Sequence, residues 1–342
     1  MSNEELFAKT YSRFKGSNFF SIIEDGYSYF TEQAYKVLKE LTKPEVKKEA
    51  NENYDYNYSE YVTMMDSLAI CRDFLLDTFG KDCLQAFDKY IKKGNIELFD
   101  ASSEEERKNH PESLEHGAHY CAIYSDKYDD EGNYIYANIF QNIEVPMFHN
   151  ICDVYDIIHE FMHATNDIYK GNRSSDRDIL GESSSITVEF ILHEYLVSKN
   201  ICPHDVHTPV IERLSLLIKE SKRLLDKLSL YYKVTSDEKY KNIKYNFSND
   251  NDKKEVLDEY YKICNILKYY LGTVIAALNY KRYIEGTLDV EKIEDYNFAI
   301  DNNDELKSLS VIFDKLPTND EVAESIDFLV HSIIKQYKSQ NK

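Results

Sequence analysis

The residues best suited to chemistry in this chain form the sequence HEFMH at positions 159–163. On a helix, His159 and His163 lie one turn apart, so both imidazoles point the same way and can bind one Zn²⁺. Glu160 lies beside them with its carboxylate free to act as a base. Glu182, with eighteen residues between it and His163, opens a second helical pattern, where it can be the third ligand and leave the fourth tetrahedral position to water.

The residues around this motif favour a metal site over a solvated helix face. Ile157, Ile158, Phe161 and Met162 make the predicted helix apolar on most sides. Imidazole and carboxylate groups among them would be buried and would need a partner. The pattern is typical of zinc peptidases whose third ligand is Glu.

Two acidic residues are candidates to support the ligands. Glu189 lies two turns beyond Glu182, on or near the same helix face, and its carboxylate can hydrogen-bond a ligating histidine. An ordinary buried polar network is the alternative interpretation of Glu189. Asp156, one turn before His159, is a weaker candidate for the same role.

The hydrophobic periodicity predicts a mainly α chain with a small antiparallel β-sheet. We expect a short N-terminal helical segment at residues 1–60, followed by one catalytic domain at 61–342. This domain should contain a sheet at 117–140, ligand-bearing helices at 153–199 and C-terminal helices at 209–342. The charged stretch 104–111 and the polar stretch 235–252 are predicted to be loops.

The first predicted strand begins with Gly117, Ala118 and His119. A strand just before a metal-binding helix can lie beside the metal, where its free edge binds an extended peptide. These three residues are therefore candidate substrate contacts, and a purely structural edge strand is the alternative. The segment 202–207 (CPHDVH) has the residue types of a second metal site, but no matching half-site occurs elsewhere.

The composition excludes several classes of partner. Forty-one Lys and Arg against 61 Asp and Glu give a net charge of −20, which repels nucleic acid and anionic membranes. The six cysteines form no C-x-x-C pair, as in reducing compartments, and the N-terminus does not resemble a secretory signal. The longest apolar run, around 269–280, is too short to span a bilayer. We expect a cytoplasmic protein with a peptide substrate.

Several further segments resemble the oligoendopeptidase F / thimet oligopeptidase family of zinc metallopeptidases, over about residues 60–310. They are residues 79–100, Gly117-Ala118 with Cys121, residues 138–142, Asp153-Val154, Glu182-x-x-Ser185-x-x-x-Glu189 and Tyr269-x-x-Gly272. The resemblance implies a zincin-type (gluzincin) fold with a helical C-terminal bundle, which cuts peptides with one Zn²⁺.

The chain departs from the family in three places. The long N-terminal half is reduced to about sixty residues, and the loop between the second histidine and Glu182 is shorter. The family places a His upstream of its C-terminal tyrosines to stabilise the oxyanion, and no His occurs between 208 and 330. Loss of such a donor costs on the order of a hundredfold in rate. Tyr269 matches the family tyrosine by position; Tyr260, Tyr261 and Tyr270 are alternatives.

The sequence thus predicts hydrolysis of peptide bonds, with Glu160 as general base and a tyrosine hydroxyl as oxyanion donor. An aminopeptidase-like enzyme is one alternative, although its usual GxMEN-type strand is replaced here by GAHYC at 117–121. The other alternative is a non-catalytic binding protein on a peptidase fold, which the shortened N-terminus and the missing His favour.

Overall fold

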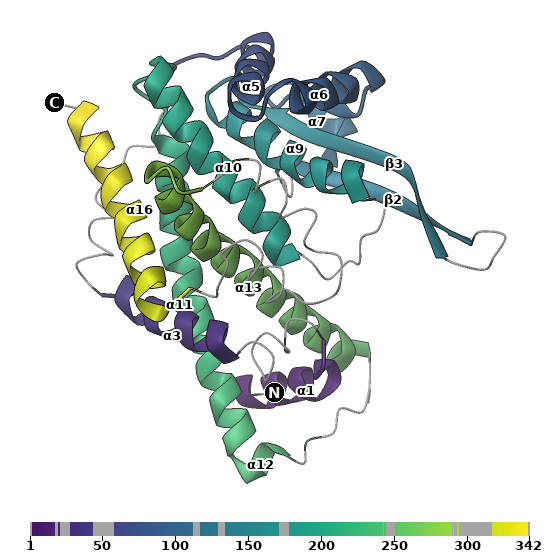
Figure 1. Cartoon of the computed structure of the whole chain (residues 1–342). Helices are drawn as coiled ribbons and strands as arrows, with labels where there is room; N and C mark the ends of the chain where they lie inside the picture. Colours follow the sequence, from purple (N-terminus) through teal and green to yellow (C-terminus); the bar gives the residue numbers. More distant parts are fainter. Residues whose placement is uncertain are drawn as a thin grey trace.

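Most of the chain is helical, as predicted, and one small sheet lies at one end (Figure 1). The computed structural model describes residues 2–17, 20, 28–43, 58–111, 117–128, 134–170, 178–241, 243, 250–288, 290, 293 and 317–340. Its elements are α1 (Asn3–Phe14), α3 (Ser28–Leu41), α5 (Met64–Phe79), α6 (Lys81–Lys93), β1 (Ile96–Asp100), α7 (Glu104–Asn109), β2 (His119–Tyr128), β3 (Tyr134–Met147), α9 (Cys152–Lys170), α10 (Asp178–Lys199), α11 (Thr208–Ser236), α12 (Glu238–Lys241), α13 (Asp250–Ile284) and α16 (Asn319–Gln340).

Helix α10 is the centre of the helical body. Every residue from Gly181 to His193 is buried, so its contacts are not limited to one apolar stripe. It packs against α9 and against α13, and Figure 1 shows it beside both. Helix α10, which carries Glu182, therefore lies between α9, which carries the HExxH sequence, and the long helix α13. The connection between α9 and α10, residues 171–177, lies outside the described residues.

The sheet is mixed, so the prediction of an antiparallel sheet confined to 117–140 was wrong. Its strand order is β1-β3-β2, with β2 antiparallel and β1 parallel to β3. Strand β3 continues to Met147 because Ile143, Val145 and Met147 are fully buried on one face of the sheet. The short strand β1 pairs with this last part of β3, from Ile96 beside Ile143 to Asp100 beside Met147, and its five residues are too few for a clear sequence pattern.

Two predicted loops contain helices. In 104–111 the chain forms α7, because the Ser103 hydroxyl accepts a hydrogen bond from the Glu106 amide at 3.3 Å and three glutamates occupy the first turn. Such a cap and such charges stabilise a helix N-terminus, even in a very polar segment. Within 235–252, α12 forms and α13 already begins.

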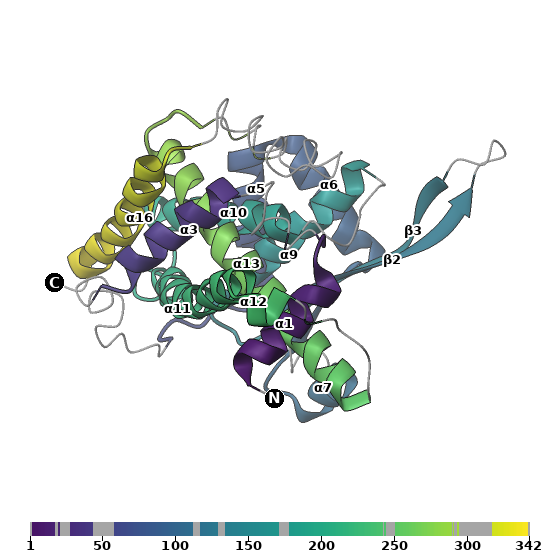
Figure 2. The same cartoon turned by 90° about the horizontal axis from the view of Figure 1, so that it is seen from below.

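The N-terminal and C-terminal helices pack together. Helix α1 contacts α11 and α13. Helix α3 contacts α11 and α16, and Figure 2 shows it beside both. Phe14 of α1 stacks on Tyr260 with ring centroids 3.8 Å apart. Helices α11, α13 and α16 also contact one another, as expected of a C-terminal helical bundle. No helix in the described part of the chain is long and apolar enough to cross a membrane.

Candidate metal centre

Helices α9 and α10 bring the three predicted ligands to one point. Nε2 of His159 lies 3.1 Å from Nε2 of His163. The Glu182 carboxylate approaches both rings, with Oε2 3.4 Å from His159 Nε2 and Oε1 3.5 Å from His163 Nε2. The three donor atoms lie within 4.8 Å of one another, so these residues could hold one metal ion.

The spacing of these atoms fits a small tetrahedral ion. With metal–ligand bonds of about 2.0–2.1 Å, the donor atoms of a tetrahedral site lie about 3.3–3.4 Å apart. The Oε2 atom of Glu182 is buried and has no hydrogen-bond partner within the described residues. An unpaired buried carboxylate oxygen is costly, and a cation between the donors removes that cost.

The groups around Glu182 keep its carboxylate ionised. Burial raises the pKa of Glu182, but His163, His159 and Lys268 outweigh it and hold that pKa well below its usual value. The Lys268 Nζ lies 2.8 Å from Glu182 Oε1. Burial also disfavours a charged His159, yet the neighbouring carboxylates of Glu182 and Glu189 raise its pKa to about 10. Glu182 therefore remains in the anionic form that binds a metal.

Glu189 lies where a supporting carboxylate is needed. Its Oε1 lies 2.5 Å from Nδ1 of His159, which leaves the Nε2 atom of that ring directed at the other ligands. Arg213 of α11 holds Glu189 from the other side: its Nε donates to Oε2 at 3.1 Å and its Nη2 donates to Oε1 at 2.6 Å. Asp156, the other predicted supporter, lies in the cavity wall, and burial raises its pKa to about 7.

Arg213 was not predicted, although the sequence contains a signal for it. Helix α11 buries a stripe that includes Val210, Leu214 and Leu217, and Arg213 lies within this stripe. A charged side chain among buried apolar ones needs a partner, which here is Glu189. Which residue becomes the partner of Arg213 depends on how α11 crosses α10, and the local spacing of residues does not encode that crossing.

The structure predicts that Glu189→Gln weakens metal binding by about 10–100-fold, as loss of such supporting groups typically does. The amide cannot match the charge that orients His159 and neutralises Arg213. Competition titration with a chromophoric chelator measures the effect. The control is Glu194→Gln on the same helix, because Glu194 accepts from Tyr280 and does not contact the ligands. Equal metal affinity in the two variants would contradict this role for Glu189.

His159 and Glu160 both lie in the wall of a cavity of about 450 Å³. The pKa of Glu160 is raised to about 7, because burial and the Glu182 carboxylate together outweigh the opposite effect of His159. A carboxyl group with a pKa near neutrality can both accept and return a proton, as a general base requires.

Two of the three predicted substrate contacts line this cavity. Gly117 and Ala118, just before and at the start of the sheet, form part of its wall. His119 does not, and its Nδ1 lies 3.3 Å from the carbonyl oxygen of Gly117. The prediction for His119 therefore lacks geometric support: in the antiparallel register it pairs with Glu144 of β3.

The structure describes all four tyrosines that are candidate oxyanion donors, and they lie in different surroundings. Tyr269 lines the cavity, and burial together with the Glu182 carboxylate raises its pKa, so the phenol keeps its proton. Tyr270 is buried and donates to the carbonyl of Ala34 at 3.4 Å. Tyr260 stacks on α1 and Tyr261 is exposed. Of the four, Tyr269 is the one placed to donate to a ligand in the cavity.

Gly272 allows α13 to approach Glu182 closely. A Cβ atom at this position would lie 3.0 Å from the Cβ of Glu182 and 3.3 Å from the backbone nitrogen of Ser183. Both distances are shorter than ordinary van der Waals contacts, so a side chain here would displace Glu182, the predicted third ligand.

Gly272→Ala should therefore lower the free energy of unfolding by about 1–3 kcal/mol, the usual cost of overpacking, and weaken metal binding. The sign of this change in the free energy of unfolding tests the close approach, because Gly→Ala inside an unstrained helix stabilises a protein by up to about 1 kcal/mol. Urea unfolding and metal titration measure the two effects. A variant that is more stable and binds metal normally would show that the close approach does not position Glu182.

Other predicted histidine sites serve structural contacts. In the segment 202–207, Asp205 accepts hydrogen bonds from the amides of Ser59 and Glu60 at 2.7 and 2.6 Å. Within the described ranges, this segment forms no group that could hold a metal. His110 stacks on Phe99, and with Glu97 and Glu144 it forms a second group of side chains whose donor atoms are close enough to hold a metal ion. Its two ring nitrogens face different carboxylates, so it links α7 to the sheet.

Comparison with protein-family models, curated proteins and solved structures found no match for this chain. The interpretation of the site therefore depends on the types, spacing and surroundings of its own residues.

Proposed function

We propose that this chain is a zinc-dependent metallopeptidase that hydrolyses peptide bonds in oligopeptides. The observation that carries this proposal is the meeting of His159, His163 and Glu182 at tetrahedral spacing. Of these residues, His159 lines a cavity together with Glu160. The resemblance of the surrounding motifs to the oligoendopeptidase F / thimet oligopeptidase family supports the same function.

Zinc suits this set of ligands better than other common divalent ions. Two imidazole nitrogens and one carboxylate are the usual protein ligands of catalytic zinc in peptidases. Calcium and magnesium prefer shells made only of oxygen atoms, which two histidines do not provide.

The bound zinc would provide a Lewis acid that acidifies water and polarises the scissile carbonyl. Glu160 takes the proton of the attacking water and passes it to the leaving amine. Tyr269 donates a hydrogen bond to the carbonyl oxygen as negative charge develops there. Strand β2 lies at an edge of the sheet, so the chain from Gly117 onward can hydrogen-bond an extended peptide.

The test combines metal analysis with digestion of a mixed peptide library, read by mass spectrometry, on the wild type and the Glu160→Gln variant. We expect one zinc per chain in both proteins and cleavage only by the wild type. Cleavage of peptides with blocked N-termini would favour an endopeptidase over the aminopeptidase alternative. Stoichiometric zinc without any cleavage by the wild type would overturn the proposal in favour of a binding protein.

A further inference from the structure

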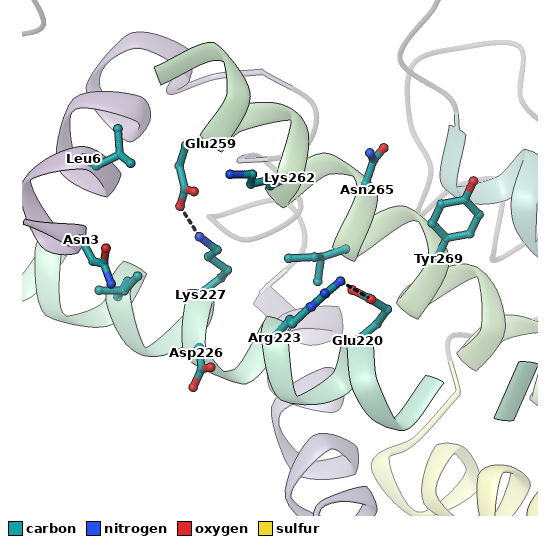
Figure 3. A pocket seen from close by; sticks show the side chains of 12 residues that line it. Asn3, Leu6, Glu220, Arg223, Asp226, Lys227, Glu259, Lys262, Asn265 and Tyr269 are labelled. Carbon is teal, nitrogen blue, oxygen red and sulfur yellow. Dashed lines mark hydrogen bonds and ion pairs between the residues drawn. The ribbon is translucent and has the colours of Figure 1, made fainter. Parts of the chain in front are cut away.

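A groove continues the metal cavity along helices α11 and α13. It has a volume of about 670 Å³ and shares two lining residues, Glu220 and Tyr269, with the cavity beside Glu160. Figure 3 shows Tyr269 at one end of this groove and Asn3 and Leu6 of α1 at the other. A molecule whose reacting bond lies at the metal can therefore extend into the groove past Tyr269.

The length of the groove corresponds to a short peptide segment. Its lining residues run from Glu259 to Tyr269 on α13 and from Glu220 to Leu230 on α11, a span of ten residue-to-residue steps on each helix. At 1.5 Å per helical residue, each wall is about 15 Å long. An extended chain rises about 3.3 Å per residue, so the groove holds about four or five residues before it meets α1.

The charges in the groove balance one another. Three cations and three carboxylates line it: Arg223, Lys227, Lys262, Glu220, Asp226 and Glu259. Arg223 pairs with Glu220 at 2.6 Å, and Lys227 pairs with Glu259 across the two helices, as the dashed lines in Figure 3 mark. The groove is thus locally neutral in a chain of net charge −20, and Leu6, Leu230 and Ile266 add apolar surface to it. Such a lining suits peptides of mixed sequence and does not select by charge.

We propose that this groove binds the substrate on one side of the scissile bond, over about four or five residues. The proposal rests on the proposed peptidase function, which places the scissile bond at the Tyr269 end. It defines the substrate class as peptides that extend at least that far beyond the cut, and it assigns α1 as the end of the binding site.

A substrate length series tests the proposal. Starting from a peptide cut by the wild type, residues are added one at a time to each side, with both ends blocked. On one side we expect kcat/KM to rise at least tenfold over four or five residues and then to stay constant. Asn265 lines the groove and Asn251 is exposed on the same helix outside it. Asn265→Trp should lose the gain with length, and Asn251→Trp should behave as the wild type. An unchanged gain in Asn265→Trp, or no gain on either side, would overturn the proposal.

Binding separates this proposal from the proposed function. In the Glu160→Gln background, fluorescence anisotropy should show at least tenfold tighter binding of the longest peptide than of the shortest, and Asn265→Trp should remove the difference. If the wild type cuts no peptide and this length effect is present, the peptidase function fails and the groove stands. If peptides are cut but binding and rate do not depend on length, the groove proposal alone fails.

Discussion

Replacing Glu160 with Gln should lower peptide hydrolysis by about 10²–10⁴-fold, the usual contribution of a general base, and leave zinc binding unchanged. Gln has nearly the shape of Glu but cannot accept the proton of the attacking water. The ligand atoms belong to other residues, so the metal should remain. Steady-state kinetics on one cut peptide, with zinc measured by mass spectrometry of the same samples, shows both effects.

The matched control for this prediction is Glu105→Gln, an identical change at an exposed position on α7, which should leave kcat/KM and zinc content unaltered. If the Glu160 variant keeps wild-type activity, Glu160 is not the base. If it loses zinc as well as activity, its role is structural and the mechanism must be revised.

Replacing His163 with Ala should remove the metal and most of the stability that depends on it. Two ligands bind zinc far more weakly than three, and Glu182 would face fewer positive groups in its buried position. For the wild type, zinc at a thousandfold excess over its Kd adds about 4 kcal/mol to the free energy of unfolding, because the ion binds only the folded chain. The variant should show almost none of this gain.

Thermal unfolding with and without zinc measures this difference, and EDTA should reduce the wild type to the level of the variant. The control is His331→Ala, since His331 lies exposed on α16 and away from the site. Stoichiometric zinc in His163→Ala, or equal zinc stabilisation of both variants, would remove His163 from the ligand set.

The sequence predicts the part of the site that depends on local spacing. His159 and His163 share one helix, and one turn between them is enough to make their rings converge. Glu182 and Glu189 share the next helix, so their common face also follows from spacing. The mainly helical class follows in the same way from hydrophobic periodicity.

The contacts that the sequence could not predict join segments far apart in the chain. Arg213 reaches Glu189, Lys268 reaches Glu182, and Gly272 permits the approach of α13 to α10. Each depends on how two helices cross, which side-chain packing over the whole core decides. The parallel pairing of β1 with β3 has the same origin, because a five-residue strand becomes stable only on a sheet that already exists.

The most direct test of the account is X-ray absorption spectroscopy at the zinc edge on the wild-type protein reconstituted with one equivalent of zinc. We expect a four-coordinate ion with two imidazoles at about 2.0–2.1 Å, a carboxylate oxygen and one solvent oxygen. The same ion in Glu182→Ala should lose the carboxylate contribution. A failure to bind zinc, or a spectrum with sulfur ligands at about 2.3 Å, would contradict the assignment of His159, His163 and Glu182 as the metal centre.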